Sequence, residues 1–205
     1  MEGVESISVA ERAEFLEPNW DAPLDPIRYL ATIPDHATIS GMFLAGMVDA
    51  AKERGHQLPS AAPRYVAFKF YPVRDHVRLM FEYSQRVFPN LSLRQGVRKI
   101  GRGASHALLS STVGRVVLAT ALDPVSSLAA FATSYGVHLR PGSAEVVRHG
   151  VDWAIVELRE VHYLLDSNHV GTLEGVLKLV GLRGHVHMRK IGPAAADYLV
   201  TWSAD

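Results

Sequence analysis

The chain has 205 residues, of which 48% are hydrophobic and 20% charged, proportions that suit one globular domain with a sizeable core. The 21 Lys and Arg balance the 21 Asp and Glu, so the formal net charge is zero and no overall field attracts nucleic acid or an anionic membrane. There are no cysteines, which excludes disulfides, thiolate zinc sites, iron–sulfur clusters and a cysteine nucleophile.

The N-terminal segment MEGVESISVAERAEF contains acidic residues and lacks the apolar centre of a signal peptide. Long apolar runs such as Val113 to Leu122 are interrupted, here by Gly114 and Arg115, and fall short of the roughly 20 residues that span a bilayer. Because the chain also lacks cysteine, we predict a cytoplasmic protein without a membrane span.

Residues 1–35 are predicted to form an arm, because four prolines are spaced too closely for long helices. Residues 36–205 are predicted to form a single α+β domain. The arm also contains apolar residues that a freely solvated tail would not need, so we expect it to lie extended across the domain with these residues docked. They are Phe15, Leu16, Trp20, Leu24, Ile27, Tyr29 and Leu30.

Helical spacing of apolar residues predicts a first helix from about Thr38 to Arg54. Residues 65–72 read as a short strand or an extended link. A second helix is predicted from about Pro72 to the residue before Pro89.

A third helix is predicted to begin after Ser92 as its N-cap. It contains Gly96, Gly101 and Gly103, each of which weakens a helix by up to about 1 kcal/mol relative to Ala. We interpret these glycines as positions of close helix packing or of a bend.

Asp123 and Pro124 predict the start of another helix, which we expect to stop at Gly136. The apolar period then changes to two, which indicates strands. The predicted elements are strands over 137–140, 144–148 and 151–158, a helix over about 163–180, and strands over 185–191 and 197–202. The sequence therefore predicts an α+β fold, with N-terminal helices packed on a small C-terminal antiparallel sheet and one late helix inserted between strands.

Several segments are similar to one known family. They are GMFLAGMVDAAKERG (41–55), PRYVAFKFYPVRDHVRLM (63–80), LRQGVRKIGRGA (93–104) and VGTLEGVLKLVG (170–181). The chain resembles, over roughly residues 10–203, the paralogous family expanded in myxobacteria and catalogued as a domain of unknown function.

A more distant likeness involves residues 170–202, where a helix with Gly171 and Gly175 is followed by strand, turn and strand. This order resembles the heme nitric-oxide-binding, 4-vinyl-reductase-like and TRAPP small-subunit group. The resemblance implies helices packed on a small sheet, with heme, small aromatic or lipid ligands between them in some members and a scaffold role in others. Heme-binding members use a proximal His and a Tyr-x-Ser-x-Arg signature, and this chain reads YSQR at Tyr83 and YGVHLR at Tyr135. We therefore predict no cofactor, with heme as the alternative.

His106 is the best-placed residue for an axial heme ligand or a polar contact inside a pocket, against the simpler reading of a surface or satisfied interior histidine. His185 and His187 alternate along a predicted strand and so share one face. With His162 or His169 they would form a zinc site, but we favour exposed histidines between buried Val186 and Met188, and predict no metal.

The sequence contains one group of closely spaced basic residues, formed by Arg94, Arg98, Lys99, Arg102 and Arg115. Such a basic stripe suits an acidic partner, a nucleotide phosphate or nucleic acid. Because the net charge is zero, we interpret it as a solvated helix face and predict no nucleic-acid partner.

No Gly-x-Ser-x-Gly elbow or paired-carboxylate motif occurs, so we predict no enzyme. The leading hypothesis is a small-molecule-sensing or signalling adaptor domain with an apolar pocket between helices and sheet. Its partners would be a small apolar ligand, another protein or a second copy of the chain. The alternatives are a dimerisation or scaffold module and a heme-based gas sensor. The candidate pocket residues are Met42, Phe43, Met47, Met80, Phe81, His106 and Leu173.

Overall fold

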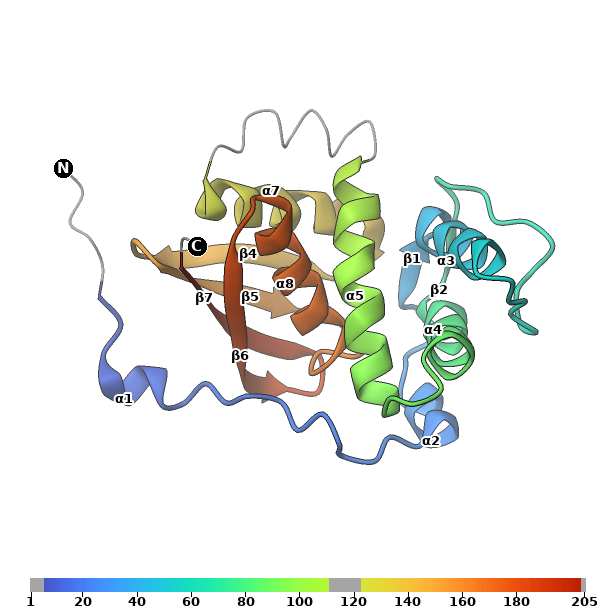
Figure 1. Ribbon diagram of the computed structural model, residues 1–205, viewed down its shortest axis with the longest axis horizontal. Helices are drawn as coiled ribbons and strands as arrows, with labels where there is room; N and C mark the ends of the chain where they lie inside the picture. Colours follow the sequence, from blue (N-terminus) through green and yellow to red (C-terminus); the bar gives the residue numbers. More distant parts are fainter. Residues whose placement is uncertain (1–5, 111–122, 204–205) are drawn as a thin grey trace.

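The computed structural model describes residues 6–110 and 123–203, with backbone only for residues 106–110. Its centre is a four-stranded antiparallel sheet with strand order β4-β5-β7-β6, shown in Figure 1. The strands are β4 (Ser143–His149), β5 (Trp153–Arg159), β6 (Arg183–Gly192) and β7 (Ala195–Ser203). The helix α8 (Asn168–Leu179) joins β5 to β6, which confirms the predicted fold class and its late inserted helix.

The helices form layers on one side of this sheet (Figure 1). The first layer, α7 (Pro124–His138) and α8, covers the sheet, and α5 (Leu93–Ser110) packs along α8. Beyond α5 lie α3 (Gly41–Glu53) and α4 (Val73–Val87). In the part of the chain that the structure describes, α5, α7 and α8 therefore lie between the sheet and the helices α3 and α4.

A small second sheet has the strand order β2-β1-β3 and connects the segments that precede α3 and α4 with the segment that follows α7. Its strands are β1 (Thr38–Ser40), β2 (Phe70–Pro72) and β3 (Leu139–Arg140). The prediction of a helix starting at Thr38 was therefore wrong by three residues, because Thr38, Ile39 and Ser40 pair with β2 and β3. Residues 65–72, for which a short strand or an extended link was predicted, form a strand only at their C-terminal end, as β2.

Two other predicted boundaries were wrong. The helix α7 continues past Gly136 to His138, since Gly136 keeps helical geometry and the chain turns extended only at Leu139. The late helix begins at Asn168 and not at Tyr163, because Leu164 has a φ of 45° that an α-helix does not permit. The predicted N-cap of α7 is confirmed, as a capping box between Asp123 and Ser126.

The two faces of β5 belong to different apolar clusters, as its alternating pattern predicts. Ala154, Val156 and Leu158 are fully buried in the main core beneath α7 and α8. Trp153 and Ile155 point to the opposite face, where they pack with Leu199 and with Phe15 of the arm.

The arm follows the molecule from the outer sheet face to α4 (Figure 1). It contains α1 (Val9–Arg12) and α2 (Pro26–Ala31). Phe15 is buried, and Trp20, Leu24, Tyr29 and Leu30 pack against the core as expected. Leu16 and Ile27 differ, being 66% and 82% exposed. Leu16 contributes its main chain instead, which exchanges two hydrogen bonds of 2.9 Å with Met188 at the edge of β6.

None of the helices in the described part of the chain has the length and apolar character that a transmembrane span requires.

Candidate functional site

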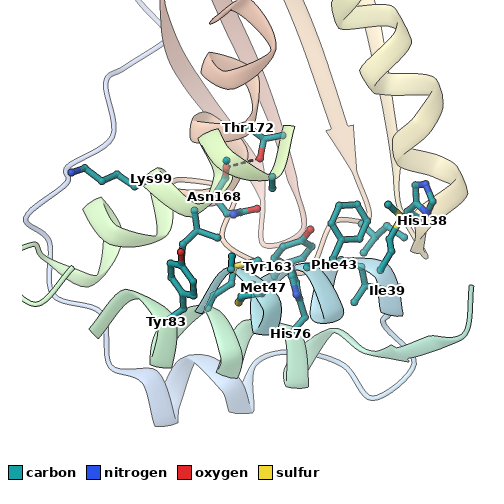
Figure 2. A pocket seen from close by; sticks show the side chains of 18 of the residues that line it. Ile39, Phe43, Met47, His76, Tyr83, Lys99, His138, Tyr163, Asn168 and Thr172 are labelled. Atoms are coloured by element: carbon teal, nitrogen blue, oxygen red, sulfur yellow. Dashed lines mark hydrogen bonds between the residues drawn. The ribbon is translucent and has the colours of Figure 1, made fainter. Parts of the chain in front are cut away.

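The described residues surround a cavity of about 750 Å³, a volume typical of small-molecule sites. It lies between the α3–α4 layer and the layer formed by α5, α7 and α8, and it is shown in Figure 2. Its walls are mainly apolar and aromatic. The apolar and aromatic side chains are Ile39, Met42, Phe43, Met47, Ala50, Met80, Tyr83, Phe88, Ile100, Ala104, Phe131, Tyr135, Leu139 and Tyr163.

This position differs from the predicted one between helices and sheet. None of the lining residues in the described chain comes from the four-stranded sheet. The reason is that α7 and α8 already cover the inner face of that sheet, so Ala154, Val156 and Leu158 have no exposed surface left. The space that remains lies one layer further out.

The mouth of the cavity lies between α3 and α5. The exposed lining residues Gly46, Glu53 and Arg54 come from α3 or its end, and Lys99 and Gly103 come from α5. A ligand would therefore enter between these two helices and meet charged side chains before the apolar interior.

His76 is the first of the polar groups in this apolar interior. It lies on α4, 4% exposed, between the rings of Phe43 and Tyr163 at centroid distances of 6.2 and 6.0 Å. Its Nδ1 has no hydrogen-bond partner among the described residues. Burial, with a smaller contribution from the nearby His169, lowers the pKa of His76 to about 3, so the imidazole is neutral at physiological pH.

A buried polar cluster adjoins His76. Nδ1 of His169 lies 3.1 Å from the carbonyl oxygen of Leu164, an acceptor, so Nδ1 carries the proton. Burial lowers the pKa of His169 to about 4, which leaves Nε2 as an acceptor for the Tyr135 hydroxyl. The hydroxyl oxygens of Tyr135 and Tyr163 lie 3.5 Å apart, and burial raises the pKa of Tyr163 to about 12. The cluster is thus uncharged near neutral pH.

Asn168, the first residue of α8, supplies the other polar group of the interior. Its backbone carbonyl accepts a hydrogen bond of 2.9 Å from the Thr172 hydroxyl and packs against Gly101 of α5. Its side chain lines the cavity, only 5% of the residue is exposed, and Nδ2 has no partner among the described residues.

The structure brings together four of the predicted pocket residues. Met42, Phe43, Met47 and Met80 line the cavity. Phe81 instead faces the arm, where its ring contacts Tyr29 at 5.9 Å, and Leu173 is buried within the core outside the cavity lining. His106 lies on α5, and its side chain is outside the described residues.

Sequence reasoning missed His76, Asn168, Tyr135 and Tyr163. A signal existed for His76, which lies three residues after Val73 and four before Met80 on the buried stripe of α4. For Asn168 there was no such signal in the sequence, because the predicted helix began five residues too early and did not show that this residue starts α8.

The predicted basic stripe takes part in internal contacts. Arg94 pairs with Asp166, while Arg98 and Arg102 both pair with Glu174 of α8. The Arg98 guanidinium also lies 4.0 Å from the ring centroid of Trp20. Lys99 stands at the cavity mouth over Phe88, and Arg115 lies outside the described residues. These arginines join α5 to α8 and to the arm.

His185 and His187 lie on the outer face of the sheet, where they are paired with Thr201 and Leu199 of β7. His169 is buried on the other side, and His162 contacts His36 at 5.7 Å. Within the described residues, no group of three or more His, Asp or Glu side chains is arranged to hold a metal ion.

We expect the protein to lose stability between pH 7.5 and pH 5.5 because of the two neutral imidazoles. Below the ordinary histidine pKa of 6.5 the unfolded chain binds protons that buried His76 and His169 do not, so the folded state is disfavoured as pH falls. Each contributes a loss of about 1.4 kcal/mol over this interval. Urea unfolding at both pH values measures it.

His76→Phe should reduce this pH-dependent loss by about 1.4 kcal/mol, and Tyr163→Phe should leave it unchanged. Tyr163→Phe is the matched control because it alters the same cluster without removing an imidazole, and burial keeps the Tyr163 pKa far above this interval. Equal pH dependence in His76→Phe and wild type would contradict the assignment.

The fold is similar to solved H-NOX structures. The Fe(II) unliganded H-NOX protein from K. algicida is 11% identical with a TM-score of 0.63, covering 82% of this chain and 98% of that chain. A mutant H-NOX protein from S. oneidensis in the Fe(II) state is 14% identical with a TM-score of 0.63, covering 82% and 97%. The H-NOX domain from Shewanella oneidensis in the Fe(II)CO state is 15% identical with a TM-score of 0.63, covering 82% and 100%. At these identities the likeness concerns the fold, and it confirms the distant resemblance predicted above.

The chain departs from the heme-binding pattern of the group that it resembles. Among the described residues, His76 and His138 are the imidazoles that line the cavity, and the Phe43 ring packs against both, at centroid distances of 6.2 and 5.5 Å (Figure 2). The sequence also lacks a Tyr-x-Ser-x-Arg run.

No curated protein matches the chain in sequence. The family model described as protein of unknown function (DUF2378) matches residues 32–203, which is most of the chain and leaves out most of the arm. The chain therefore belongs to this family of proteins of unknown function (DUF2378).

Proposed function

We propose that the protein is a cytoplasmic, non-enzymatic sensory domain that captures a small apolar molecule and transmits its occupancy to a protein partner. The observation that carries this proposal is the cavity of about 750 Å³ between two helical layers, lined mainly by apolar and aromatic side chains. A close-packed protein interior contains few voids larger than a water molecule, so a space of this size is a feature to be explained.

Two properties of the site support ligand capture. The mouth between α3 and α5 gives a path of entry, and the mainly apolar walls offer burial for an apolar ligand at about 25 cal/mol per Å². A ligand that bridges the two layers would favour the arrangement in which they are close together. Occupancy would then change the surface that α3 and α4 present to a partner.

The fold offers independent support of a weaker kind. The similar H-NOX structures are described by Fe(II) unliganded and Fe(II)CO states, so those proteins bind iron and a gas. We propose that this chain uses a related arrangement of helices and sheet for a different, apolar guest, because the sequence lacks the Tyr-x-Ser-x-Arg signature of the heme-binding members.

The test uses the neutral fluorophore N-phenyl-1-naphthylamine. The purified wild-type protein is expected to bind it at one saturable site with a blue-shifted emission. Gly46→Trp should weaken binding at least about tenfold, since the indole would fill the mouth, where a Cβ at Gly46 meets no atom within 4 Å. Gly136→Trp is the matched control: Gly136 is also exposed with open space around it, on α7 and away from the cavity lining.

Other outcomes select the alternatives. No saturable binding by folded wild-type protein, together with a dimer in native mass spectrometry, would favour the scaffold module. A Soret absorption band in protein from heme-supplied cells would favour the heme-based gas sensor, and its loss in His106→Ala would identify the axial ligand.

A further inference from the structure

The occupant of the cavity can be described more closely from one side chain. We propose that this ligand is a ring-containing, largely apolar molecule with one oxygen acceptor, and that the Asn168 amide holds this oxygen by a hydrogen bond. This inference rests on the proposed capture of a small molecule and adds the chemical class of that molecule.

The first step is the state of the Asn168 side chain. Only 5% of the residue is exposed, it lines the cavity, and Nδ2 donates to no described group. A buried amide without a partner costs free energy, and a leucine of similar size would avoid that cost. An amide kept at this position is explained when a ligand supplies the missing acceptor.

The second step is that the backbone of Asn168 is fixed. Its carbonyl oxygen accepts from Thr172, and a Cβ at Gly101 would lie only 2.1 Å from it, so α5 and α8 are in direct contact at this point. The residue cannot move away from the cavity without separating these helices. The amide can turn about its last side-chain bond, a soft torsion in asparagine, and this turn would bring Nδ2, which is now buried without a partner among the described residues, to the cavity.

The third step is the chemistry around the amide. In Figure 2 the Asn168 side chain extends toward Tyr163, and His76 lies on the other side of Tyr163. Tyr83, Phe131, Tyr135 and Phe43 complete an aromatic wall. Aromatic walls favour ring systems, which stack or make edge contacts with them. A polar donor in such surroundings orients a carbonyl oxygen.

The experiment compares fluorene with 9-fluorenone, two flat tricyclic compounds of nearly the same shape that differ by one carbonyl oxygen. Their dissociation constants are measured by competition with N-phenyl-1-naphthylamine. Wild type is expected to bind 9-fluorenone about tenfold more tightly than fluorene, the ratio expected for one hydrogen bond. In Asn168→Leu this preference should disappear while fluorene binding is retained and the unliganded variant unfolds at an equal or higher temperature.

Ser134→Ala is the matched control. Ser134 is also buried with an unpartnered hydroxyl oxygen among the described residues, but it does not line the cavity. Its substitution should leave the preference for 9-fluorenone at the wild-type ratio.

If wild type binds both compounds equally, or if Asn168→Leu keeps the preference, the role of Asn168 is overturned while capture of an apolar molecule stands. If folded wild type binds N-phenyl-1-naphthylamine but neither compound, the inferred ligand class is overturned, and if it binds none of the three, both proposals fail. Should Asn168→Leu not fold, the infrared carbonyl stretch of 9-fluorenone bound to wild type decides the matter. A shift to lower frequency than in an apolar solvent supports the hydrogen bond, and an unshifted band overturns it.

Discussion

Gly101→Ala is expected to lower the free energy of unfolding by about 3 kcal/mol, toward the upper end of the range for overpacked cores. A Cβ at Gly101 would lie 2.1 Å from the carbonyl oxygen of Asn168 and 3.0 Å from the backbone nitrogen of Thr172. Both atoms belong to the backbone of α8, so no side-chain rotation relieves the overlap and the two helices must separate. Urea unfolding followed by circular dichroism measures the loss.

Gly103→Ala is the matched control, two residues further along the same helix. A Cβ at Gly103 meets no atom within 4 Å, so the change should stabilise the protein by up to about 1 kcal/mol through helix propensity alone. If the two variants have similar stability, close contact between α5 and α8 is not what requires Gly101.

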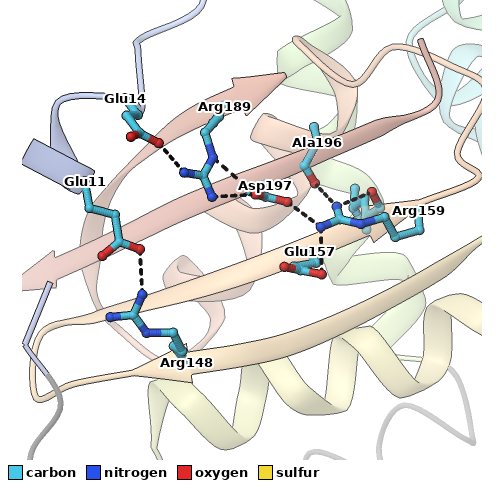
Figure 3. A network of polar contacts seen from close by, with 9 residues as sticks. Glu11, Glu14, Arg148, Glu157, Arg159, Arg189, Ala196 and Asp197 are labelled. Carbon is cyan, nitrogen blue, oxygen red and sulfur yellow. Dashed lines mark hydrogen bonds and ion pairs between the residues drawn. The ribbon is translucent and has the colours of Figure 1, made fainter. Parts of the chain in front are cut away.

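Asp197→Ala is expected to destabilise the protein by about 2–3 kcal/mol, the upper part of the range for hydrogen bonds to a charged group, because the two arginines that lose this partner are about a third exposed. The Asp197 side chain is 3% exposed on the outer face of β7. Its carboxylate oxygens lie 2.7 Å from Nη2 of Arg159 and 2.8 Å from Nη2 of Arg189, as Figure 3 shows. Thermal unfolding with a urea series measures the loss.

The same substitution should loosen the arm. Arg189 also pairs with Glu14 of the arm, and its guanidinium lies 4.8 Å from the ring centroid of Phe15. Without Asp197, Arg189 is no longer held in this orientation, so limited proteolysis should cut residues 6–25 faster than in wild type.

Glu14→Gln is the control for this pair of effects. The Glu14 side chain is 55% exposed, so its ion pair with Arg189 is worth at most about 1 kcal/mol. A loss in Glu14→Gln as large as that in Asp197→Ala would show that the arm contact, and not the buried carboxylate, carries the stability.

The late sheet and its helix were predictable because their signals are local. Alternating apolar residues in 153–158 place Val156 and Leu158 on one face and Trp153 and Ile155 on the other, and the structure buries each set in its own cluster. The Asp123–Pro124 pair likewise set the start of α7, since an N-cap depends only on the next few residues.

The glycines of α5 were predicted in part. Close packing holds for Gly96, whose Cβ would meet the Ser84 side chain, and for Gly101, but Gly103 faces open space. The sequence shows only that a helix carries glycines. Which of them face a neighbour depends on where α4 and α8 lie.

Only some residues of the candidate site could be predicted from the sequence. Met42, Phe43, Met47 and Met80 were predicted from helix faces and line the cavity, whereas Phe81 and Leu173 satisfy the same periodicity and face other parts of the core. Periodicity identifies a buried face, but core and cavity wall have the same apolar composition.

The α+β class, the order of the main helices and strands, and the lack of cysteine chemistry could be predicted from the amino-acid sequence, because these depend on composition and on spacing within about twenty residues. The packing of the layers places the cavity between two helical layers, with His76 Nδ1 and Asn168 Nδ2 in its lining residues and without a partner among the described residues. It also decided that the basic residues of α5 pair with α8 and the arm. These features bring together residues far apart in the sequence, such as Arg98 and Glu174, 76 positions apart, or His76 and Asn168, 92 positions apart. Such proximity follows from how the layers pack, which no local pattern records.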